Sequence, residues 1–158
     1  MGLDCTHDAW HGAYSAFMRW RRMIATAAGL PPLDLMEGFY CKLDGSDGPP
    51  TLYHGASTNK PALGADSRPH LAGIDERLPI KWSALDPSPL HELLYHSDCE
   101  GEIAADRCVL IASALEAVIP MLPDIVTEGH IGNPREKTAM FVAGLRLAAQ
   151  NEEPLLFR

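Results

Sequence analysis

Three segments of the chain repeat apolar residues at helical spacing, and this pattern limits the fold more than any other feature. The first runs from Tyr14 to Ala28, where Gly29 is suited to a left-handed helix cap and Pro31-Pro32 prevents continuation. The second extends from Ile103 to Leu122. The third follows Asn133. We therefore expect three helices.

The third helix has the clearest start signal. Asn133 is a good N-cap, Pro134 fits the first helical position, and Glu136 stands where a capping-box acid is found. The second helix has a clear stop, because Pro120 and Pro123 interrupt its pattern.

Strands are expected to be few and short. At Leu90–His96 we favour a strand over a helix, because Pro87 and Pro89 disfavour a helix immediately upstream. Short strands are also predicted at Thr51–His54 and at Leu78–Trp82, and an edge strand at Pro154–Phe157. The segment 44–89 holds seven of the 13 prolines and five of the 13 glycines, and it is interpreted as an irregular excursion. Its length is unusual for a connection in a compact domain.

These elements predict the α+β class: a small, mainly antiparallel sheet packed with about three helices. The 158 residues fit a single domain, 1–158, with the excursion at 44–89. A doubly wound sheet would need more strand and helix alternation than the sequence contains.

Charge argues against nucleic acid as a partner, since the formal net charge is −8. The basic residues Arg19, Arg21 and Arg22 are interpreted as a solvated helix face. No apolar run is long enough to span a membrane, and the N-terminus lacks the features of a secretion signal. The four cysteines are scattered without a CxxC pair, so we expect a cytoplasmic protein without disulfides.

A first polar cluster lies just before the first helix. Its candidate ligand-binding residues combine imidazole, carboxylate and aromatic groups: His7, Asp8, Trp10, His11 and Tyr14. The alternative is structural, with Thr6 or Asp8 capping the first helix and the two aromatic side chains in the core.

A second polar cluster follows the predicted strand at Leu90–His96. Its candidate ligand-binding residues are His96, Ser97, Asp98, Cys99 and Glu102. The alternative is an acidic N-terminus of the second helix. The neighbouring acids oppose a thiolate at Cys99, and Ser97 lacks the glycine-flanked elbow of a hydrolase nucleophile.

A metal site would require the two clusters to meet. The candidate ligands for zinc or another divalent metal are His7, His11, His96 and Asp98. His7 and His11 would share a helical face if the first helix began early. The HDAWH segment has the outer spacing of the HExxH zinc-protease motif, but an aspartate replaces its catalytic glutamate, so this reading is disfavoured.

A third candidate is the segment from Gly129 to Lys137, where Arg135 and Lys137 could form an anion-binding edge. A solvated surface loop is the alternative. Neither a GxGxxG nor a GxxxxGK[ST] motif is present.

Several stretches resemble a family of small uncharacterised bacterial and phage proteins: GLDCTHDAWHGAYSAFMRWR, DLMEGFY, LPIKW, PLHELLYHSDCEGEI and REKTAMFVAGLRLAAQ. The resemblance excludes residues 44–78. Typical members read HSDCDGEI where this chain has Glu100, so the histidine-serine-aspartate turn is a family trait. Occurrence in phages implies counter-defence as one role, for example sequestering a nucleotide-type signal.

The leading hypothesis is a small-ligand-binding protein with one pocket between the two polar clusters. There Trp10 and Tyr14 would stack on a planar group, and Asp98 and Glu102 would bind hydroxyls or amines. Either Arg135 or Lys137 would contact a phosphate. One alternative is a metal-dependent hydrolase using the same histidines and acids. Another is a protein–protein interaction module acting through the 44–89 excursion. The sequence leaves open whether any reaction is catalysed and whether the chain forms a homo-oligomer.

Overall fold

The computed structural model describes residues 2–39, 79–125 and 132–158. The chain divides into two compact units. One combines Met1–Leu30 with Pro87–Arg158, and the other is Pro31–Asp86. Each unit is described separately.

A four-stranded antiparallel sheet lies in the larger unit. Its strands are β1 (Leu3–Cys5), β2 (Trp10–Gly12), β3 (Gly101–Ile103) and β4 (Leu155–Phe157), in the order β2-β1-β4-β3. The predicted α+β class is confirmed. The C-terminal segment does form a strand, but it lies inside the sheet instead of at its edge, because it pairs with β1 on one side and β3 on the other.

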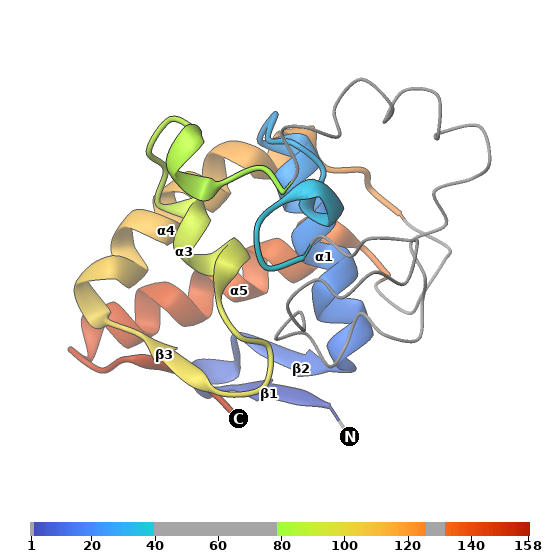
Figure 1. Ribbon diagram of the computed structural model, residues 1–158. Coiled ribbons are helices and arrows are strands. Elements are labelled where there is room, and N and C mark those ends of the chain that lie inside the picture. The colour runs from blue at the N-terminus through green and yellow to red at the C-terminus, as the bar shows by residue number, and fades with distance from the viewer. Residues whose placement is uncertain (1, 40–78, 126–131) are drawn as a thin grey trace. The chain divides into compact units, whose positions relative to one another are not determined.

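The sheet has one covered face and one open face. Leu3 and Cys5 are buried while Asp4 between them is exposed, which is the alternation expected of a strand with one face on the core. In Figure 1 the strands lie along the bottom of the view and α5 crosses directly above them. The face that carries Asp4 is called the outer face below.

Four α-helices occur among the described residues of the larger unit: α1 (Tyr14–Ala27), α3 (Leu90–Tyr95), α4 (Ala105–Val118) and α5 (Pro134–Gln150). Short 3-10 turns are η1 (Thr6–Asp8) and η6 (Ile119–Met121). Helices α4 and α5 pack antiparallel, since an ion pair joins Glu116 to Arg146 and Arg135 reaches back to Leu122.

Aromatic side chains build the core between the sheet and the helices. The Phe17 ring centroid lies 5.0 Å from that of Trp10, 5.4 Å from Trp20 and 5.9 Å from Phe157. Phe141 of α5 lies 4.9 Å from Trp20. Because these rings come from α1, α5, β2 and β4, their contacts hold the helices onto the sheet.

The predicted end of the first helix and the predicted start of the third are confirmed. Gly29 adopts a φ of +71°, and Leu30 N–H donates to the Ala25 carbonyl at 2.9 Å, which is the Schellman cap. At the start of α5, the Asn133 side chain accepts from the amides of Arg135 and Glu136.

The predicted strand at Leu90–His96 is wrong, because Leu90–Tyr95 is the helix α3. Pro89 has helical φ and ψ of −58° and −26°, and Ser88 Oγ accepts from the Leu90 amide. Prolines restrict the residue before them, yet proline itself is favoured at a helix start. Three leucines at helical spacing are buried: Leu90, Leu93 and Leu94.

The start of the second predicted helix is also corrected. Ile103 belongs to β3 and pairs with Leu155, and α4 begins at Ala105. Ile103 is fully buried, like the apolar residues of α4, so its side chain extends the apolar pattern in the sequence although it is not part of the helix.

The smaller unit is described at 31–39 and 79–86. It contains the 3-10 turns η2 (Leu33–Leu35) and η5 (Trp82–Ala84), and a parallel bridge joins Met36 to Ile80. No strand forms at the described part of the predicted Leu78–Trp82 segment, because Ile80 makes only this isolated bridge and Trp82 begins η5. The strand predicted at Thr51–His54 lies outside the described residues.

Within the described ranges, the helices are too short or too polar to cross a lipid bilayer.

Candidate functional site

The two predicted polar clusters lie at different places on the sheet. His11 belongs to β2 and pairs with Asp4 on the outer face. His96 precedes β3, at the opposite edge, and its ring stacks on Phe157, a buried residue of the covered face. His11 and His96 therefore lie at opposite edges of the sheet and on opposite faces, contrary to the prediction of one shared pocket.

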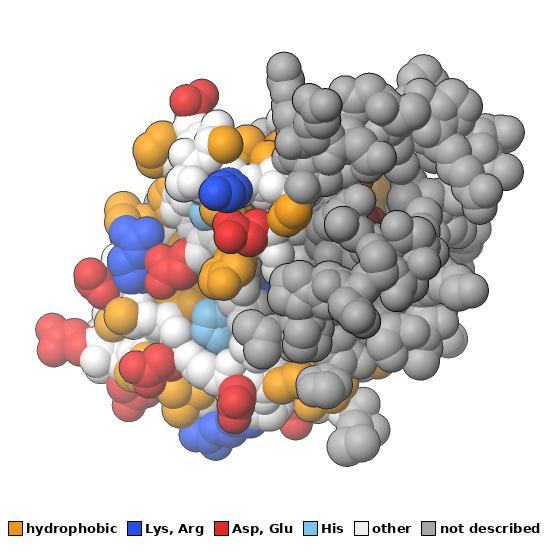
Figure 2. Space-filling view, in the orientation of Figure 1, with side chains coloured by type: hydrophobic (Ala, Val, Ile, Leu, Met, Phe, Trp, Pro, Cys, Tyr) orange, Lys and Arg blue, Asp and Glu red, His pale blue; other side chains and the backbone are white. Residues whose placement is uncertain are grey.

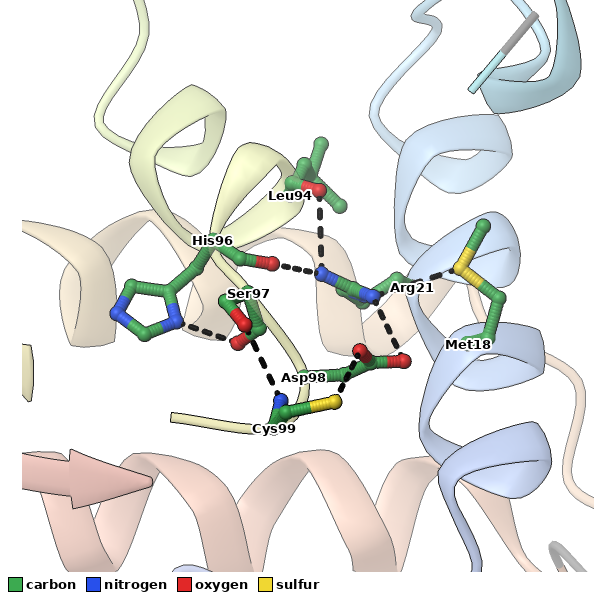
Figure 3. A network of polar contacts seen from close by, with 7 residues as sticks. All are labelled: Met18, Arg21, Leu94, His96, Ser97, Asp98 and Cys99. Atoms are coloured by element: carbon green, nitrogen blue, oxygen red, sulfur yellow. Dashed lines mark hydrogen bonds and ion pairs between the residues drawn. The ribbon is translucent and has the colours of Figure 1, made fainter. Parts of the chain in front are cut away.

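Arg21 of α1 organises the second cluster from inside the protein (Figure 3). Its guanidinium is fully buried and donates to the carbonyls of His96 at 2.5 Å and Leu94 at 3.4 Å. The same group lies 3.7 Å from the Asp98 carboxylate, which is also buried. Arg21 thus binds the carbonyl end of α3 and neutralises the acid that follows it.

Two further predictions are corrected by this network. Arg21 is not part of a solvated helix face, since its side chain is buried. Asp98 is not available to bind hydroxyls or amines, because it is directed at Arg21 (Figure 3). The predicted acidic N-terminus of the second helix is also wrong, because the HSDCEGE segment connects α3 to β3.

The His96 ring completes the turn by packing and hydrogen bonding. It stacks on Phe157 with centroids 4.1 Å apart. Its Nδ1 lies 2.6 Å from the Ser97 carbonyl oxygen and its Nε2 lies 3.3 Å from that of Glu102. A Cβ on Gly101 would lie 2.9 Å from the ring, so this position requires glycine. These contacts give His96 a structural role in the turn.

Ser97, Cys99 and Glu102 occupy exposed positions of the same turn. Ser97 Oγ accepts from the Cys99 amide at 3.2 Å, which is a local turn interaction. Burial and the nearby Asp98 carboxylate raise the pKa of the Cys99 thiol. A reactive thiolate is therefore disfavoured here, as the acidic neighbours predicted.

Arg135 also has a structural role. It donates to the carbonyls of Leu122 at 2.7 Å and Pro120 at 3.3 Å, and pairs with Asp124 at 2.5 Å. The first amides of α5 are taken by Asn133. The predicted anion-binding edge at Arg135 is therefore not formed in this arrangement, and its part at 129–131 lies outside the described residues.

The first cluster stays exposed and contains a hydrogen-bonded group, which we call the hairpin cluster: Asp4, Asp8 and His11. His11 Nδ1 lies 2.9 Å from Asp4 Oδ1, and His11 Nε2 lies 3.2 Å from Asp8 Oδ1. These two hydrogen bonds, that to Asp4 first, raise the pKa of His11. The protonated ring donates from both nitrogens, so each carboxylate has a donor and still offers oxygens to solvent.

The turn that presents the hairpin cluster has an uncommon backbone. His7 and Asp8 have φ values of +57° and +54°, in the left-handed region that non-glycine residues rarely adopt. Two contacts fix this turn. Ala9 is buried against Gly144 of α5, where a Cβ on the glycine would lie 2.7 Å from Ala9 Cα. Thr6 Oγ1 accepts from the Leu156 amide at 2.9 Å.

The other residues of the first cluster lie apart from it. His7 Nε2 lies 3.5 Å from Glu153 Oε2. Trp10 is a core residue, only 2% exposed, so it cannot stack on a ligand from the surface. Tyr14 begins α1 and is partly buried. The helix cap is Ala13, so the alternative that Thr6 or Asp8 caps α1 is wrong, as is an early start of that helix.

The candidate metal ligands do not converge. His7 and His11 have separate carboxylate partners, and His96 and Asp98 belong to the turn before β3. Among residues 2–39, 79–125 and 132–158, no three His, Cys, Asp or Glu side chains are arranged to hold a metal ion.

Charges on the described surface are mixed. Figure 2 shows Asp and Glu side chains spread over the part of this face that the structure describes, with Lys and Arg between them. Local groups therefore determine which ligand chemistry each place would favour, because salt screens exposed charges beyond about 8 Å at physiological ionic strength.

Sequence reasoning missed the structural importance of Arg21, Gly101 and Gly144. Arg21 did carry a signal, since it lies one turn from Phe17 and one turn from Ile24 on the buried face of α1. The two glycines carried no such signal in the sequence. A side chain is excluded at Gly101 by His96 and at Gly144 by Ala9, and these contacts arise only in the tertiary fold.

Comparisons with known proteins gave no match to a protein-family model, to a curated protein or to a solved structure.

Proposed function

We propose that this chain is a small-ligand-binding protein whose ligand contacts the hairpin cluster. The observation that carries the proposal is the exposed His11 ring held between two carboxylates, those of Asp4 and Asp8. This arrangement stands on a turn with two successive left-handed residues.

The backbone of this turn supports the proposal. Left-handed conformations of non-glycine residues are costly and concentrate at functional sites, where surrounding contacts maintain them. Here the Ala9–Gly144 contact and the Thr6–Leu156 hydrogen bond maintain them. The carboxylate oxygens are therefore held in place before a ligand arrives, which reduces the ordering cost of binding.

The chemistry of the cluster favours a ligand that carries hydroxyl or amine donors. Two carboxylates and one imidazolium leave the cluster with a negative charge, so an anionic group is unfavourable directly upon it. Ribose hydroxyls satisfy this requirement. Sequestration of a nucleotide-type signal by a phage counter-defence protein, as the family resemblance implies, remains our specific proposal for the biological role.

A metal-dependent hydrolase is less well supported. Both ring nitrogens of His11 already bind carboxylates, so neither is free to coordinate a metal in this arrangement. An interaction module would depend on the 44–89 excursion, most of which lies outside the described residues. We also propose the cytoplasm as the compartment, where the free thiols of Cys5, Cys99 and Cys108 would remain reduced.

The proposal is tested by thermal unfolding with fractions of a low-molecular-mass extract of bacterial cells. At least one fraction should raise the Tm of the unmodified protein, because a ligand that binds only the folded state stabilises it. Asp8→Asn should abolish this rise. Asparagine also tolerates the left-handed conformation, so the variant removes the charge with little change to the turn.

Glu100→Gln is the matched control, since Glu100 is an exposed acid near the opposite edge of the sheet. It should retain the full Tm rise. A fraction that stabilises the unmodified protein and Asp8→Asn equally would contradict the proposed site. If no fraction raises the Tm, small-ligand binding itself is rejected.

A further inference from the structure

Helix α4 is apolar on its outward side as well as on its buried side. From Cys108 to Met121 the only charged residue is Glu116. Leu110 is 46% exposed, and Met121, in the turn that follows the helix, is 70% exposed. A helix of a globular protein that is apolar on all sides is typically buried on all sides. The outward side of α4 therefore has the composition of a surface that another element covers.

Helix α5 extends this exposed apolar surface. From Thr138 to Ala149 the only charged residue is Arg146, and Met140 and Leu147 are 45% and 44% exposed. Because α4 and α5 pack antiparallel and side by side, their outward sides form one surface, which we call the α4–α5 face. Its apolar members are Leu110, Ala117, Met121, Met140, Ala143 and Leu147.

The centre of the α4–α5 face is electrically balanced. Arg146 donates to both carboxylate oxygens of Glu116, at 2.9 and 2.6 Å. The other exposed acids on the two helices, Asp106 and Glu136, lie at opposite ends of the face, because each stands in the first turn of its own helix. Two copies of a chain with a net charge of −8 repel each other. A neutral, apolar face is where they can approach at the lowest electrostatic cost.

A twofold axis parallel to the helices makes the charges of this face complementary. Such an axis places α4 of one copy against α5 of the other, again antiparallel, as neighbours are in a four-helix bundle. Glu116 of one copy then lies opposite Arg146 of the second copy, and the reverse pair forms by symmetry. The charges that pair within each chain can thus also pair between two chains.

The same axis brings apolar side chains of similar size together. Within one chain Glu116 pairs with Arg146, which defines the register of the two helices. By this register the Leu110 end of α4 comes opposite the Leu147 end of α5 in the second copy. The alanines of the face, Ala117 and Ala143, lie between these ends, and their small side chains allow the helices to approach closely.

We propose that the α4–α5 face binds a second copy of this chain and forms a twofold dimer with a four-helix bundle at its centre. The face is about 20 Å long and about 20 Å wide, from the rise per residue and the spacing of packed helices. An interface of this size is at the small end of specific contacts, so the dimer is reversible, with a dissociation constant on the order of tens of micromolar. The proposal does not depend on the hairpin cluster, since that cluster contains no residue of α4 or α5.

Sedimentation velocity of the full chain tests the proposal, at protein concentrations from about 5 μM to about 500 μM. The sedimentation coefficient should rise from that of a monomer to that of a dimer and go no further, because a twofold contact is closed. Ala143→Glu should raise the dissociation constant about tenfold or more, since it places an unpaired acid within the interface. Ser15→Glu is the control: it adds the same charge at an exposed position of α1 and should dimerise like the unmodified protein.

A charge exchange tests the twofold arrangement itself. Glu116→Arg alone should weaken the dimer, because it places arginines opposite each other both within a chain and between the copies. Adding Arg146→Glu restores opposite charges in both places, so the double variant should dimerise again.

Three results would overturn the proposal. The first is a chain that stays monomeric at about 500 μM, which would leave the α4–α5 face to a different protein. The second is a double variant that dimerises no better than Glu116→Arg. The third is growth beyond a dimer, which would indicate non-specific association of the apolar side chains.

Discussion

The Arg21 guanidinium lies 3.7 Å from the Asp98 carboxylate, and both groups are buried next to the carbonyl end of α3. Arg135 repeats this arrangement at the end of η6, where it binds two carbonyls and pairs with Asp124. In both cases the two carbonyls and the acid are two residues apart along the chain. Arg21 contacts the carbonyls of residues 94 and 96 and the acid at 98, and Arg135 contacts the carbonyls of 120 and 122 and the acid at 124. In each case, an arginine from another helix therefore binds the carbonyls at and just after the C-terminal end of a helix.

Removing the buried acid should destabilise the protein strongly. We expect Asp98→Ala to lower the free energy of unfolding by about 3–5 kcal/mol, because the variant leaves the Arg21 charge buried without its carboxylate. Urea denaturation measures this change. Glu116→Ala, which removes an exposed ion pair with Arg146, is the control and should have a much smaller effect. Equal effects of the two substitutions would show that Asp98 has no special role.

Gly101 should not tolerate a side chain. In Gly101→Ala the new Cβ would meet the His96 ring at 2.9 Å, and the φ of +122° is unfavourable for alanine. We expect a loss of about 1–3 kcal/mol, the usual cost of such backbone strain. Thermal unfolding checks this value, and an unchanged Tm would mean that the His96 ring is not held against β3.

Gly144 provides a second steric test, because it contacts Ala9, which follows the left-handed turn at His7 and Asp8. Alanine favours helix over glycine by about 1 kcal/mol, so Gly144→Ala would stabilise an unobstructed helix. Here the added methyl group collides with Ala9, and we expect a net loss of about 1–3 kcal/mol from overpacking. Chemical denaturation shows directly whether the substitution lowers or raises the free energy of unfolding. A stabilised variant would show that the turn does not rest on α5.

The hairpin cluster should titrate as a unit. The hydrogen bonds that His11 donates to Asp4 and Asp8 raise the pKa of its ring above 6.5, so the folded state binds this proton more tightly than the unfolded state. Its contribution to stability is therefore complete below pH 6.5 and is lost as the pH rises through the folded-state pKa. NMR titration of the His11 ring should show this elevated pKa.

Asp4→Asn should lower the His11 pKa more than Asp8→Asn does, since the hydrogen bond to Asp4 is the largest cause of the shift. The reverse order, or a normal pKa in the unmodified protein, would contradict the geometry of the cluster.

Local sequence signals predicted the helices well where a cap was encoded. Gly29 and Asn133 each determine a helix end through interactions with nearby backbone groups, so their roles are visible in the sequence. The start of α3 was missed because Pro89 was interpreted as a helix breaker instead of a helix start. The position of β4 inside the sheet depends on pairing with β1, far away in the chain, and no local pattern encodes it.

The candidate site was only partly predictable for the same reason. The first cluster supplied the residues of the hairpin cluster, but Trp10 was placed at a surface that it does not reach. In the second cluster, a polar run looked like a binding segment because its buried partner, Arg21, lies on a different helix. Polar residues that satisfy a buried partner and polar residues that bind a ligand have the same appearance in a sequence.

The most direct test of the central claim is to map chemical shifts of the backbone amides when the stabilising extract fraction is added. We predict that the largest changes fall between Asp4 and Gly12, where the hairpin cluster lies. Changes concentrated between Leu94 and Glu102, with the hairpin unaffected, would contradict the claim.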